Sequence, residues 1–429
     1  MKYYSLGKQS PEVSFKEATL RGIAPDRGLY FPKQIPEFPP VFWKNLGGRD
    51  FNEVANELMQ AFTGASIPAP QLRQILAKTL SFEFPLRQLT AHISVLELFH
   101  GPTMAFKDVG ATFMAGCLGY FSEQTDRKTV VLVATSGDTG GAVARGFLNV
   151  PGVEVVILYP KDKVSDIQER QLTTLGANIR ALRVSGTFDT CQAMVKQAFQ
   201  DPVLRENQEL TSANSINVAR WLPQMLYYVR ALQQLPGETT EPVFSVPSGN
   251  FGNLCAGMLA SHMGMPCGQF IAATNTNDTV PRFMKTLDYQ PKPAIPTLSN
   301  AMDVADPSNF IRIQELFQQD FPNMASELTA TSFTDAQTLE ALQELFADFG
   351  YIADPHGAVG YLGLKQYLKT HPEARGIFLE TAHPIKFRET VESCLETRLE
   401  LPEQIRGLLD REKVFTDIST YEELRDALR

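Results

Sequence analysis

The chain is poor in the residues that form disulfide frameworks and metal clusters. Its five cysteines (Cys117, Cys191, Cys255, Cys267 and Cys394) lie far apart, are odd in number and include no C-x-x-C pair. This usage argues against a disulfide framework or a zinc ribbon and is typical of a reducing compartment, so we expect a cytoplasmic protein. The six histidines show no metal-ligand spacing, and we expect no metal site.

Long apolar segments and blocks of one charge are also absent. No apolar run reaches the roughly 18 residues that would suggest a membrane span, and residues 1–8 lack the apolar region of a signal peptide, so we expect neither. The net charge is −9, with charges of both signs interspersed. Because nucleic acids and anionic membranes both require basic patches, we expect neither as a partner.

What is present is the composition of an ordinary globular protein. At 429 residues the chain is too long for one core, and two or three domains are expected. Residues 1 to about 95 form a unit of their own, with helices predicted over 51–62 and 72–80 and no catalytic candidate.

From about residue 93 onward, strands and helices alternate. Strands are predicted over 129–135, 153–159, 179–184, 243–247, 269–274 and 376–379, and helices over 165–175 (closed by Gly176), 189–199 and 335–349. Such alternation predicts an α/β fold with mostly parallel sheet covered by helices, and ligands at the carboxyl ends of the strands.

The first candidate for chemistry is Lys107, which lies among Met104, Ala105, Phe106 and Val109. Apolar enclosure disfavours the ammonium ion and lowers the pKa of the lysine, leaving a neutral amine that can form a Schiff base with an aldehyde cofactor. The alternative for a lysine alone is a stem that crosses apolar surface while its head reaches water. Two glycine-rich loops further along favour the first interpretation.

Both loops lie between a predicted buried strand and a predicted helix. The first, 136–141 (SGDTGG), follows the strand 129–135, and the second, 248–253 (SGNFGN), follows the strand 243–247. Glycines at such a turn let backbone N–H groups converge at a helix N-terminus, where an anion can bind. Either loop alone is equally compatible with a tight turn that binds nothing. Together with the lysine they form a set: an amine for an aldehyde, a cradle for a phosphate and a cradle for a carboxylate.

This set resembles the fold-type II pyridoxal-phosphate enzymes and, within them, the threonine synthase family. The motifs that carry the resemblance span nearly the whole chain: SFKEATLRGIAPDRGLYFP (14–32), LFHGPTMAFKD (98–108), ATSGDTG (134–140), SANSIN (212–217), VPSGNFGN (246–253), AATNTND (272–278), DPHGAVGY (354–361) and TAHP-x-KF (381–387). The resemblance implies two mostly parallel-sheet lobes with pyridoxal 5'-phosphate between them, plus an N-terminal domain. The expected divisions are 1–95 for the N-terminal domain, 96–390 for the two-lobed catalytic domain and 391–429 for a C-terminal helical tail.

The resemblance also implies a role for each motif residue toward the cofactor. Lys107 would carry the cofactor as a Schiff base and later move protons between substrate carbons. Thr381 falls where the family places a hydroxyl against the pyridine nitrogen, although Glu380 beside it departs from the family pattern. Asp138 would lie near the phenolic oxygen, which its charge would repel unless it is protonated or offset. The cofactor phosphate would be held by Ser248, Gly249, Asn250, Phe251, Gly252 and Asn253.

Two further groups of residues would bind substrate. The resemblance implies that Ser136, Gly137 and Thr139 receive its carboxylate, and that Asn214, Ser215 and Arg220 contact its phosphate, for which the fork of donors of an arginine is well suited. Without the resemblance, the segment 212–220 would be taken for an ordinary helix start with a Ser or Asn cap. His100, His356 and His383 lie inside motifs, and we expect structural roles for them.

The reaction implied by the resemblance is the conversion of O-phospho-L-homoserine and water to L-threonine and phosphate, as the last step of threonine biosynthesis. Protons leave Cα and then Cβ, phosphate leaves Cγ, and water adds at Cβ. The rivals are another fold-type II enzyme, such as a serine/threonine dehydratase or a phospho-amino-acid lyase, and a catalytically inert homologue that only binds. We expect a monomer or a homodimer.

Overall fold

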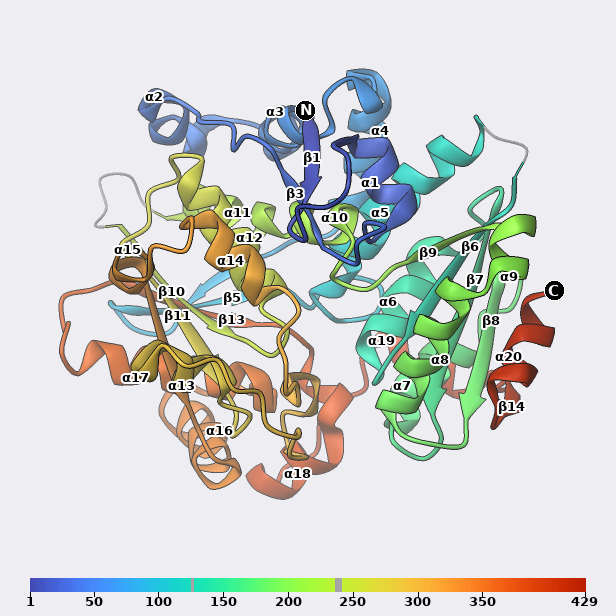
Figure 1. The fold of residues 1–429 in the computed structure, drawn as a ribbon. Helices are drawn as coiled ribbons and strands as arrows, with labels where there is room; N and C mark the ends of the chain where they lie inside the picture. The colour runs from blue at the N-terminus through green and yellow to red at the C-terminus, as the bar shows by residue number, and fades with distance from the viewer. Residues whose placement is uncertain (125–126, 236–240) are drawn as a thin grey trace.

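Two sheets of mostly parallel strands lie side by side, and a small antiparallel sheet with its helices lies above them (Figure 1). The computed structural model describes residues 1–124, 127–235 and 241–429. The predicted α/β class, with two mostly parallel-sheet lobes and an additional N-terminal part, is confirmed.

The larger sheet is parallel except at one edge. Its strands, in spatial order, are β12 (Leu328–Ser332), β11 (Gln269–Thr274), β10 (Val243–Pro247), β13 (Gly376–Glu380), β5 (Ile93–Glu97) and the antiparallel β4 (Leu86–Gln88). The helical segments of this lobe are α10 (Val218–Trp221), η3 (Leu222–Gln224), α11 (Met225–Gln234), α12 (Gly252–His262), α13 (Thr279–Thr286), η4 (Asn300–Met302), α14 (Phe310–Leu316), α15 (Phe321–Glu327), α16 (Asp335–Phe349), α17 (Pro355–Leu368), η5 (Pro384–Phe387) and α18 (Arg388–Leu395).

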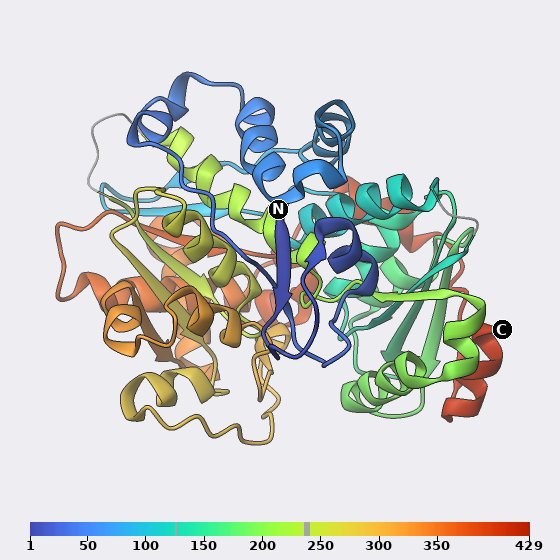
Figure 2. The same ribbon diagram turned by 45° about the horizontal axis from the view of Figure 1, so that its top comes forward.

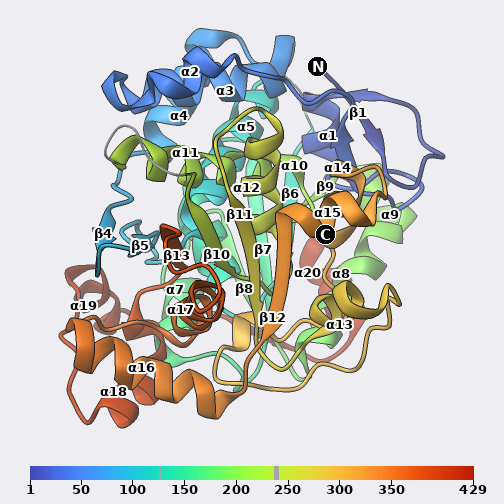
Figure 3. The same ribbon diagram turned by 90° about the vertical axis from the view of Figure 1, so that its left-hand side faces the viewer.

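Alternate side chains of this sheet enter two different cores, as the period of two in a strand requires. Phe244 and Phe270 pack with α11 and α12, whereas Val243 and Ile271 pack with α16 and α17. Figure 3 looks at this lobe, with α16, α17 and α18 below the strands. A strand covered on both faces reads as continuous apolar sequence, which is why β10 and β11 are recognisable from the sequence.

The second sheet is wholly parallel. Its strands, in spatial order, are β14 (Thr416–Ile418), β8 (Ile179–Val184), β7 (Val153–Pro160), β6 (Thr129–Ala134) and β9 (Glu209–Ser212). Its helices are α5 (Lys107–Ser122), α6 (Asp138–Phe147), α7 (Asp166–Thr173), α8 (Phe188–Gln200), α9 (Pro202–Asn207), α19 (Glu403–Leu409) and α20 (Tyr421–Leu428). All six residues of β6 are buried, and the strand ends directly before the first glycine loop.

The N-terminal part supports the helix that begins at Lys107. It consists of the strands β2 (Val13–Ser14), β1 (Lys2–Ser5) and β3 (Tyr30–Pro32), and of α1 (Phe15–Arg21), α2 (Pro40–Lys44), η1 (Leu46–Gly48), α3 (Phe51–Thr63), η2 (Gly64–Ser66) and α4 (Ala69–Thr79). Helices α1 and α4 both contact α5. Figure 2 brings these elements forward and shows them across the top of the two lobes.

The chain beyond α18 returns from the first lobe to the second. Helix α18 packs on α16, whereas α19 contacts α7, β14 pairs with β8, and α20 packs on α8. The tail therefore contains a strand as well as helices, and it ties the two lobes together. Within the described residues, none of the helices combines the length and the apolar character needed to span a membrane.

Helix α7 is shorter than the sequence indicates. The predicted helix over 165–175 ends at Thr173, and Gly176, with φ +64°, lies beyond it rather than at its cap. The hydroxyls of Thr173 and Thr174 donate to the carbonyls of Glu169 and Arg170, both at 2.8 Å. These side chains satisfy carbonyls of the last turn, so the helix ends without a glycine cap.

Glu380, at the end of β13, is a fully buried carboxyl group. Its Oε1 accepts a hydrogen bond from the backbone N–H of Asp354 at 2.6 Å, while Oε2 lies against Gly357 with no hydrogen-bond partner among the described residues. Burial and then the neighbouring Asp354 raise the pKa of Glu380 well above its usual value. The fold therefore favours the protonated acid.

We predict that Glu380→Gln becomes more stable than the parent protein as pH rises from 5 to 8. A carboxyl whose pKa is raised on folding contributes stability that is fully present below its unfolded pKa and is lost as pH rises toward its folded pKa, by up to about 1.4 kcal/mol per pH unit. Glutamine keeps the shape and the acceptor but does not titrate. Thermal unfolding across this pH range measures the difference.

The matched control is Glu392→Gln, because Glu392 pairs with Arg388 at the surface and the pKa of its carboxyl is lowered. Its stability difference from the parent should stay constant over the same range. Parallel curves for Glu380→Gln and the parent would contradict the assignment of a protonated Glu380.

Candidate functional site

Lys107 begins α5 directly after a segment that is joined to the end of β13. The N–H of Phe106 donates to the carbonyl of Thr381 at 2.9 Å, and the N–H of His383 donates to the carbonyl of Met104 at 3.1 Å. The backbone of Met104 has φ +56°, a left-handed conformation that is uncommon for residues other than glycine. The motif around Lys107 and the TAHP motif, far apart in the sequence, thus form one backbone-linked unit.

The side chain of Lys107 is enclosed, with 18% of its surface exposed. Its Nζ lies 3.9 Å from Oδ2 of Asp138 and 4.6 Å from the centre of the Phe106 ring. Burial lowers the pKa of Lys107, although the charge of Asp138 acts in the opposite direction. Burial therefore favours the neutral form of the amine, which is the form that attacks an aldehyde.

Asp138, the first residue of α6, faces a second lysine that sequence reasoning missed. Nζ of Lys386 lies 2.7 Å from Oδ1 of Asp138, and the Gln168 amide donates to the same oxygen at 3.0 Å. Burial alone would raise the pKa of Asp138, but Lys386 and then Lys107 hold it well below its usual value. Lys386 therefore balances the charge of Asp138 within the protein.

The first glycine loop is shaped by a threonine that precedes it. The hydroxyl of Thr135 accepts hydrogen bonds from the N–H groups of Gly137 and Gly140, each at 2.9 Å. Gly137 has φ +136°, and a Cβ there would lie 2.5 Å from the side chain of Gln168. The N–H of Gly137 is thus already engaged, and the donors that a helix start leaves open belong to Asp138 and Thr139.

The second glycine loop opens α12 through Phe251, which has φ +59° and is 3% exposed. A Cβ on Gly249 would lie 2.6 Å from the backbone of Met302, so this position requires glycine. The hydroxyl of Ser248 donates to the carbonyl of Val246 at 2.8 Å. Nδ2 of Asn253 is buried and has no hydrogen-bond partner among the described residues.

The segment 212–220 bridges the two loops. Nδ2 of Asn214 donates to the carbonyl of Ala134, at the end of β6, at 3.2 Å. The hydroxyl of Ser215 accepts from Nδ2 of Asn250, in the second loop, at 2.8 Å. The structure therefore brings this third motif to the junction of the two lobes, as expected for residues that bind one ligand together with both loops.

Arg220 is a buried cation without an ion-pair partner among the residues that the structure describes. It is 3% exposed, and its Nε and Nη1 have no hydrogen-bond partner there. Burial lowers the pKa of Arg220 to about 10, with Tyr227 and Asp108 acting against this shift. A buried guanidinium with free donors is costly unless an anion compensates it.

The residues present fit a cofactor that carries an aldehyde and a phosphate. Lys107 supplies the amine, and the N-terminus of α12 together with the unpaired amide of Asn253 supplies donors for an anion. Thr381, at 6% exposure, is fixed by the backbone hydrogen bond of its carbonyl to Phe106. Glu380 points toward Asp354 and Gly357, so its carboxyl belongs to the packing of α17.

The histidines within the motifs make contacts that suit structural roles. Nδ1 of His356 lies 2.9 Å from Oδ1 of Asp354, and Nε2 accepts from the N–H of Ala301 at 3.2 Å. His383 caps η5 by accepting from the N–H of Ile385 at 3.1 Å, and burial, then the charge of His100, lowers its pKa to about 4.

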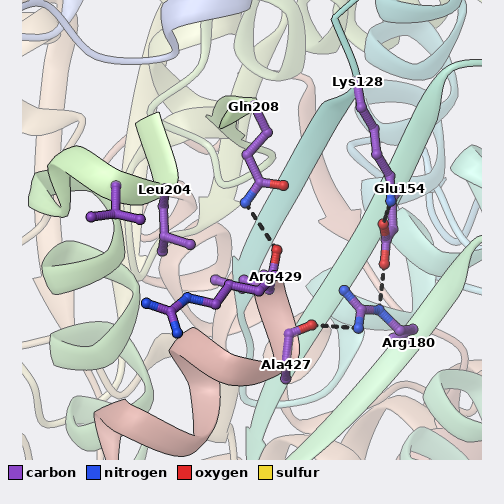
Figure 4. A pocket seen from close by; sticks show the side chains of 9 residues that line it. Lys128, Glu154, Arg180, Leu204, Gln208, Ala427 and Arg429 are labelled. Atoms are coloured by element: carbon purple, nitrogen blue, oxygen red, sulfur yellow. Dashed lines mark hydrogen bonds and ion pairs between the residues drawn. The ribbon is translucent and has the colours of Figure 1, made fainter. Parts of the chain in front are cut away.

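A hollow of about 610 Å³ lies away from these residues, at the amino ends of β6, β7 and β8 (Figure 4). Glu154 forms ion pairs there with Lys128 and Arg180, and Arg180 donates to the carbonyl of Ala427. The glycine loop after β6 lies at the opposite, carboxyl end of the strand. In parallel sheets ligands bind at that carboxyl end, so we assign the site to the loops and not to this hollow.

Comparison with known proteins adds independent observations. Residues 82–379 match the family described as pyridoxal-phosphate dependent enzyme, residues 2–80 match threonine synthase N terminus, and residues 357–427 match threonine synthase, C-terminal. The chain is 45% identical over 411 residues to the threonine synthase of Escherichia coli (strain K12), covering 96% of this chain and 95% of that protein.

Solved structures give the same relationship. The crystal structure of threonine synthase from Escherichia coli has a TM-score of 0.93 at 42% identity, covering 100% of this chain and 99% of that one. The structure of pyridoxal-phosphate-bound threonine synthase from Brucella melitensis has a TM-score of 0.93 at 34% identity, covering 100% and 98%. Maize serine racemase, at 14% identity and a TM-score of 0.53, covers 74% of this chain and 94% of that one, and shares the fold alone. With the lysine, both loops and the bridging segment assembled in one place, the chain belongs to the threonine synthase family of pyridoxal-phosphate-dependent enzymes.

Proposed function

We propose that the chain converts O-phospho-L-homoserine and water to L-threonine and phosphate. The observation that carries this proposal is the number of places for anions. There are two glycine loops at helix N-termini, and the segment that bridges them ends in the buried Arg220, whose Nε and Nη1 lack partners among the described residues. A cofactor phosphate and a substrate carboxylate account for the loops. A substrate with a phosphate of its own accounts for Arg220.

The cofactor would be held by Lys107, by Ser248, Gly249, Asn250, Phe251, Gly252 and Asn253 around its phosphate, by Thr381 at its ring nitrogen and by Asp138 near its phenolic oxygen. When bound, pyridoxal phosphate supplies the electron sink that lets protons leave Cα and Cβ of an amino acid. The Thr381 hydroxyl is a neutral partner for a ring nitrogen, and the charge of Asp138 is offset by Lys386 at 2.7 Å.

The substrate would be oriented by two groups of residues. Ser136 and Thr139, which lies in the first turn of α6, would receive its carboxylate, with Gly137 shaping the turn between them. Asn214, Ser215 and Arg220 would contact its phosphate. Such binding would place Cα and Cβ near the amine of Lys107, which would carry protons between the carbons. Protons leave Cα and Cβ, phosphate leaves Cγ, a proton is added at Cγ, water adds at Cβ, and a proton returns to Cα.

The nearest rival is a dehydratase or lyase of the same fold, which would release 2-oxobutanoate and ammonia. A serine/threonine dehydratase has no substrate phosphate to compensate the buried Arg220, whereas a phospho-amino-acid lyase has one, so the lyase is distinguished by its products alone. The five cysteines are all free, which supports our further proposal of a cytoplasmic enzyme. We propose a monomer or a homodimer that acts on a small molecule without nucleic acid.

Lys107→Ala should abolish cofactor attachment and nearly all turnover while the fold is retained. The variant lacks the amine that is proposed to carry the cofactor, while Lys386 stays paired with Asp138, so the absorption band of the attached cofactor should disappear. Absorbance spectra and phosphate release measure both effects. Lys128→Ala, a change at an exposed lysine beside the distant hollow, should alter neither, and an unchanged spectrum in Lys107→Ala would refute the assignment.

Arg220→Met should raise the KM for phosphohomoserine by roughly 10- to 100-fold, because a hydrogen bond to a charged group contributes about 1.5–3 kcal/mol. Thermal stability should not fall, since the guanidinium Nε and Nη1 have no partners among the described residues to lose. The KM from steady-state kinetics reports binding of the substrate phosphate, and the cofactor absorbance reports binding of the cofactor and its phosphate. Loss of cofactor with an unchanged KM would place Arg220 on the wrong phosphate.

The contrasting variant is Arg312→Met. Arg312 is also fully buried, but it donates to the carbonyls of Ser215, Tyr30 and Ile216 and to the side chain of Asn309. This change should lower thermal stability. Arg220→Met should instead raise the KM for phosphohomoserine, so the two variants distinguish a ligand-binding arginine from a structural one.

A further inference from the structure

Two lysines from different segments face one carboxylate in the site. Asp138 lies 2.7 Å from Nζ of Lys386 and 3.9 Å from Nζ of Lys107. Lys386 is nearer to Asp138, yet the sequence motif indicates Lys107 as the lysine that reacts. The side chain of Lys386 has no exposed surface, and the proposed function assigns it no contact with substrate.

Contacts within the protein compensate the positive charge of Lys386, so it does not need a ligand to do so. Besides Asp138, its Nζ donates to the carbonyl of Thr103 at 2.9 Å. The same Thr103 donates through its N–H, at 2.9 Å, and through its hydroxyl to Asp108, a buried carboxylate. Lys386 therefore sits in a fixed position between two acids, held by a backbone carbonyl.

Lys386 and Lys107 are each held in their own position. The segment that carries Lys386 is fastened to the segment before Lys107 by the backbone hydrogen bonds of Thr381 and His383. Asp138 comes from α6 of the second lobe, where the side-chain amide of Gln168 also donates a hydrogen bond to its Oδ1. The carboxylate is thereby kept on Lys386 and at a distance from Lys107 that is too long for a hydrogen bond.

We propose that Lys386 is a positioning residue, which occupies the carboxylate of Asp138 so that Lys107 remains free to react with the aldehyde of the cofactor. The inference rests on the proposed function for the role of Lys107. In that step the amine nitrogen attacks the aldehyde carbon, a C=N bond forms, and the carbonyl oxygen leaves as water with the two protons of the amine. The attacking nitrogen must be unprotonated, which a close ion pair with Asp138 would oppose.

The charges around Lys107 define what removal of Lys386 should do. Asp138 from α6 and Asp354 from the segment before α17 raise the pKa of Lys107, whereas Lys386 from η5 and Arg220 from α10 lower it, all in addition to burial. Lys386→Met removes one of the lowering charges and leaves Asp138 to Lys107 alone. Both effects raise the pKa of the amine.

The test is the pH dependence with which Lys107 takes up pyridoxal phosphate. Full-length protein freed of cofactor is mixed with pyridoxal phosphate from pH 6 to 10, reduced with borohydride, and the label on Lys107 is measured by peptide mass spectrometry. In Lys386→Met the midpoint should shift upward by at least one pH unit, with at least a tenfold slower reaction at pH 7.5 that recovers at high pH. Lys386→Arg should stay close to the parent.

Two further variants separate this role from a merely structural one. Lys386→Met combined with Asp138→Asn removes both charges of the pair, and its midpoint should return toward that of the parent. Lys413→Met removes a lysine that pairs with Asp166 and Glu169 at the surface, and its midpoint should not move. Circular dichroism and thermal unfolding establish that each variant is folded.

The inference is overturned if folded Lys386→Met shows the parental midpoint, or if the double variant stays shifted. Failure of the proposed function has a different signature. The parent protein would then still take up pyridoxal phosphate on Lys107 with a measurable pH midpoint, but it would release no threonine from phosphohomoserine. The labelling experiment still decides the role of Lys386 in that case.

Discussion

The ion pair between Lys386 and Asp138 is the interaction on which the site depends. Asp138 is buried at the N-terminus of α6, next to the loop proposed to receive the substrate carboxylate, and its charge is balanced at 2.7 Å by a lysine of the first lobe. Breaking a buried pair by removing one partner leaves an uncompensated charge, which is strongly destabilising. This contact therefore fixes the charge near the proposed cofactor position and joins the two lobes beside the reactive lysine.

The architecture around this pair explains why three distant motifs meet. The carboxyl ends of β6 and β10 present one glycine loop from each lobe, and the segment 212–220 connects them through Asn214 and Ser215. The strand-like pairing of Ala105 with Ala382 holds the lysine segment against the end of β13. The returning C-terminal tail adds β14 to the second sheet, so the lobes are linked on a further side.

Much of this arrangement is predictable from the sequence, because its signals are local. β6, β10 and β11 are predominantly apolar runs, both glycine loops follow such runs, and Lys107 stands in an apolar segment. The role of Lys386 is not local: it depends on a contact between residues 138 and 386, which no periodicity reveals. The buried carboxyl of Glu380 likewise depends on a contact with Asp354 that is distant in the sequence. The short strands β1, β2 and β14 escape prediction because two to four residues carry too little pattern.

The most direct measurement is the fate of O-phospho-L-homoserine incubated with the purified protein and pyridoxal phosphate in deuterium oxide, followed by proton NMR. The account predicts equal amounts of phosphate and threonine, with deuterium at Cα and one deuterium in the methyl group, because protons return at Cα and at Cγ. Release of 2-oxobutanoate and ammonia in place of threonine would contradict it.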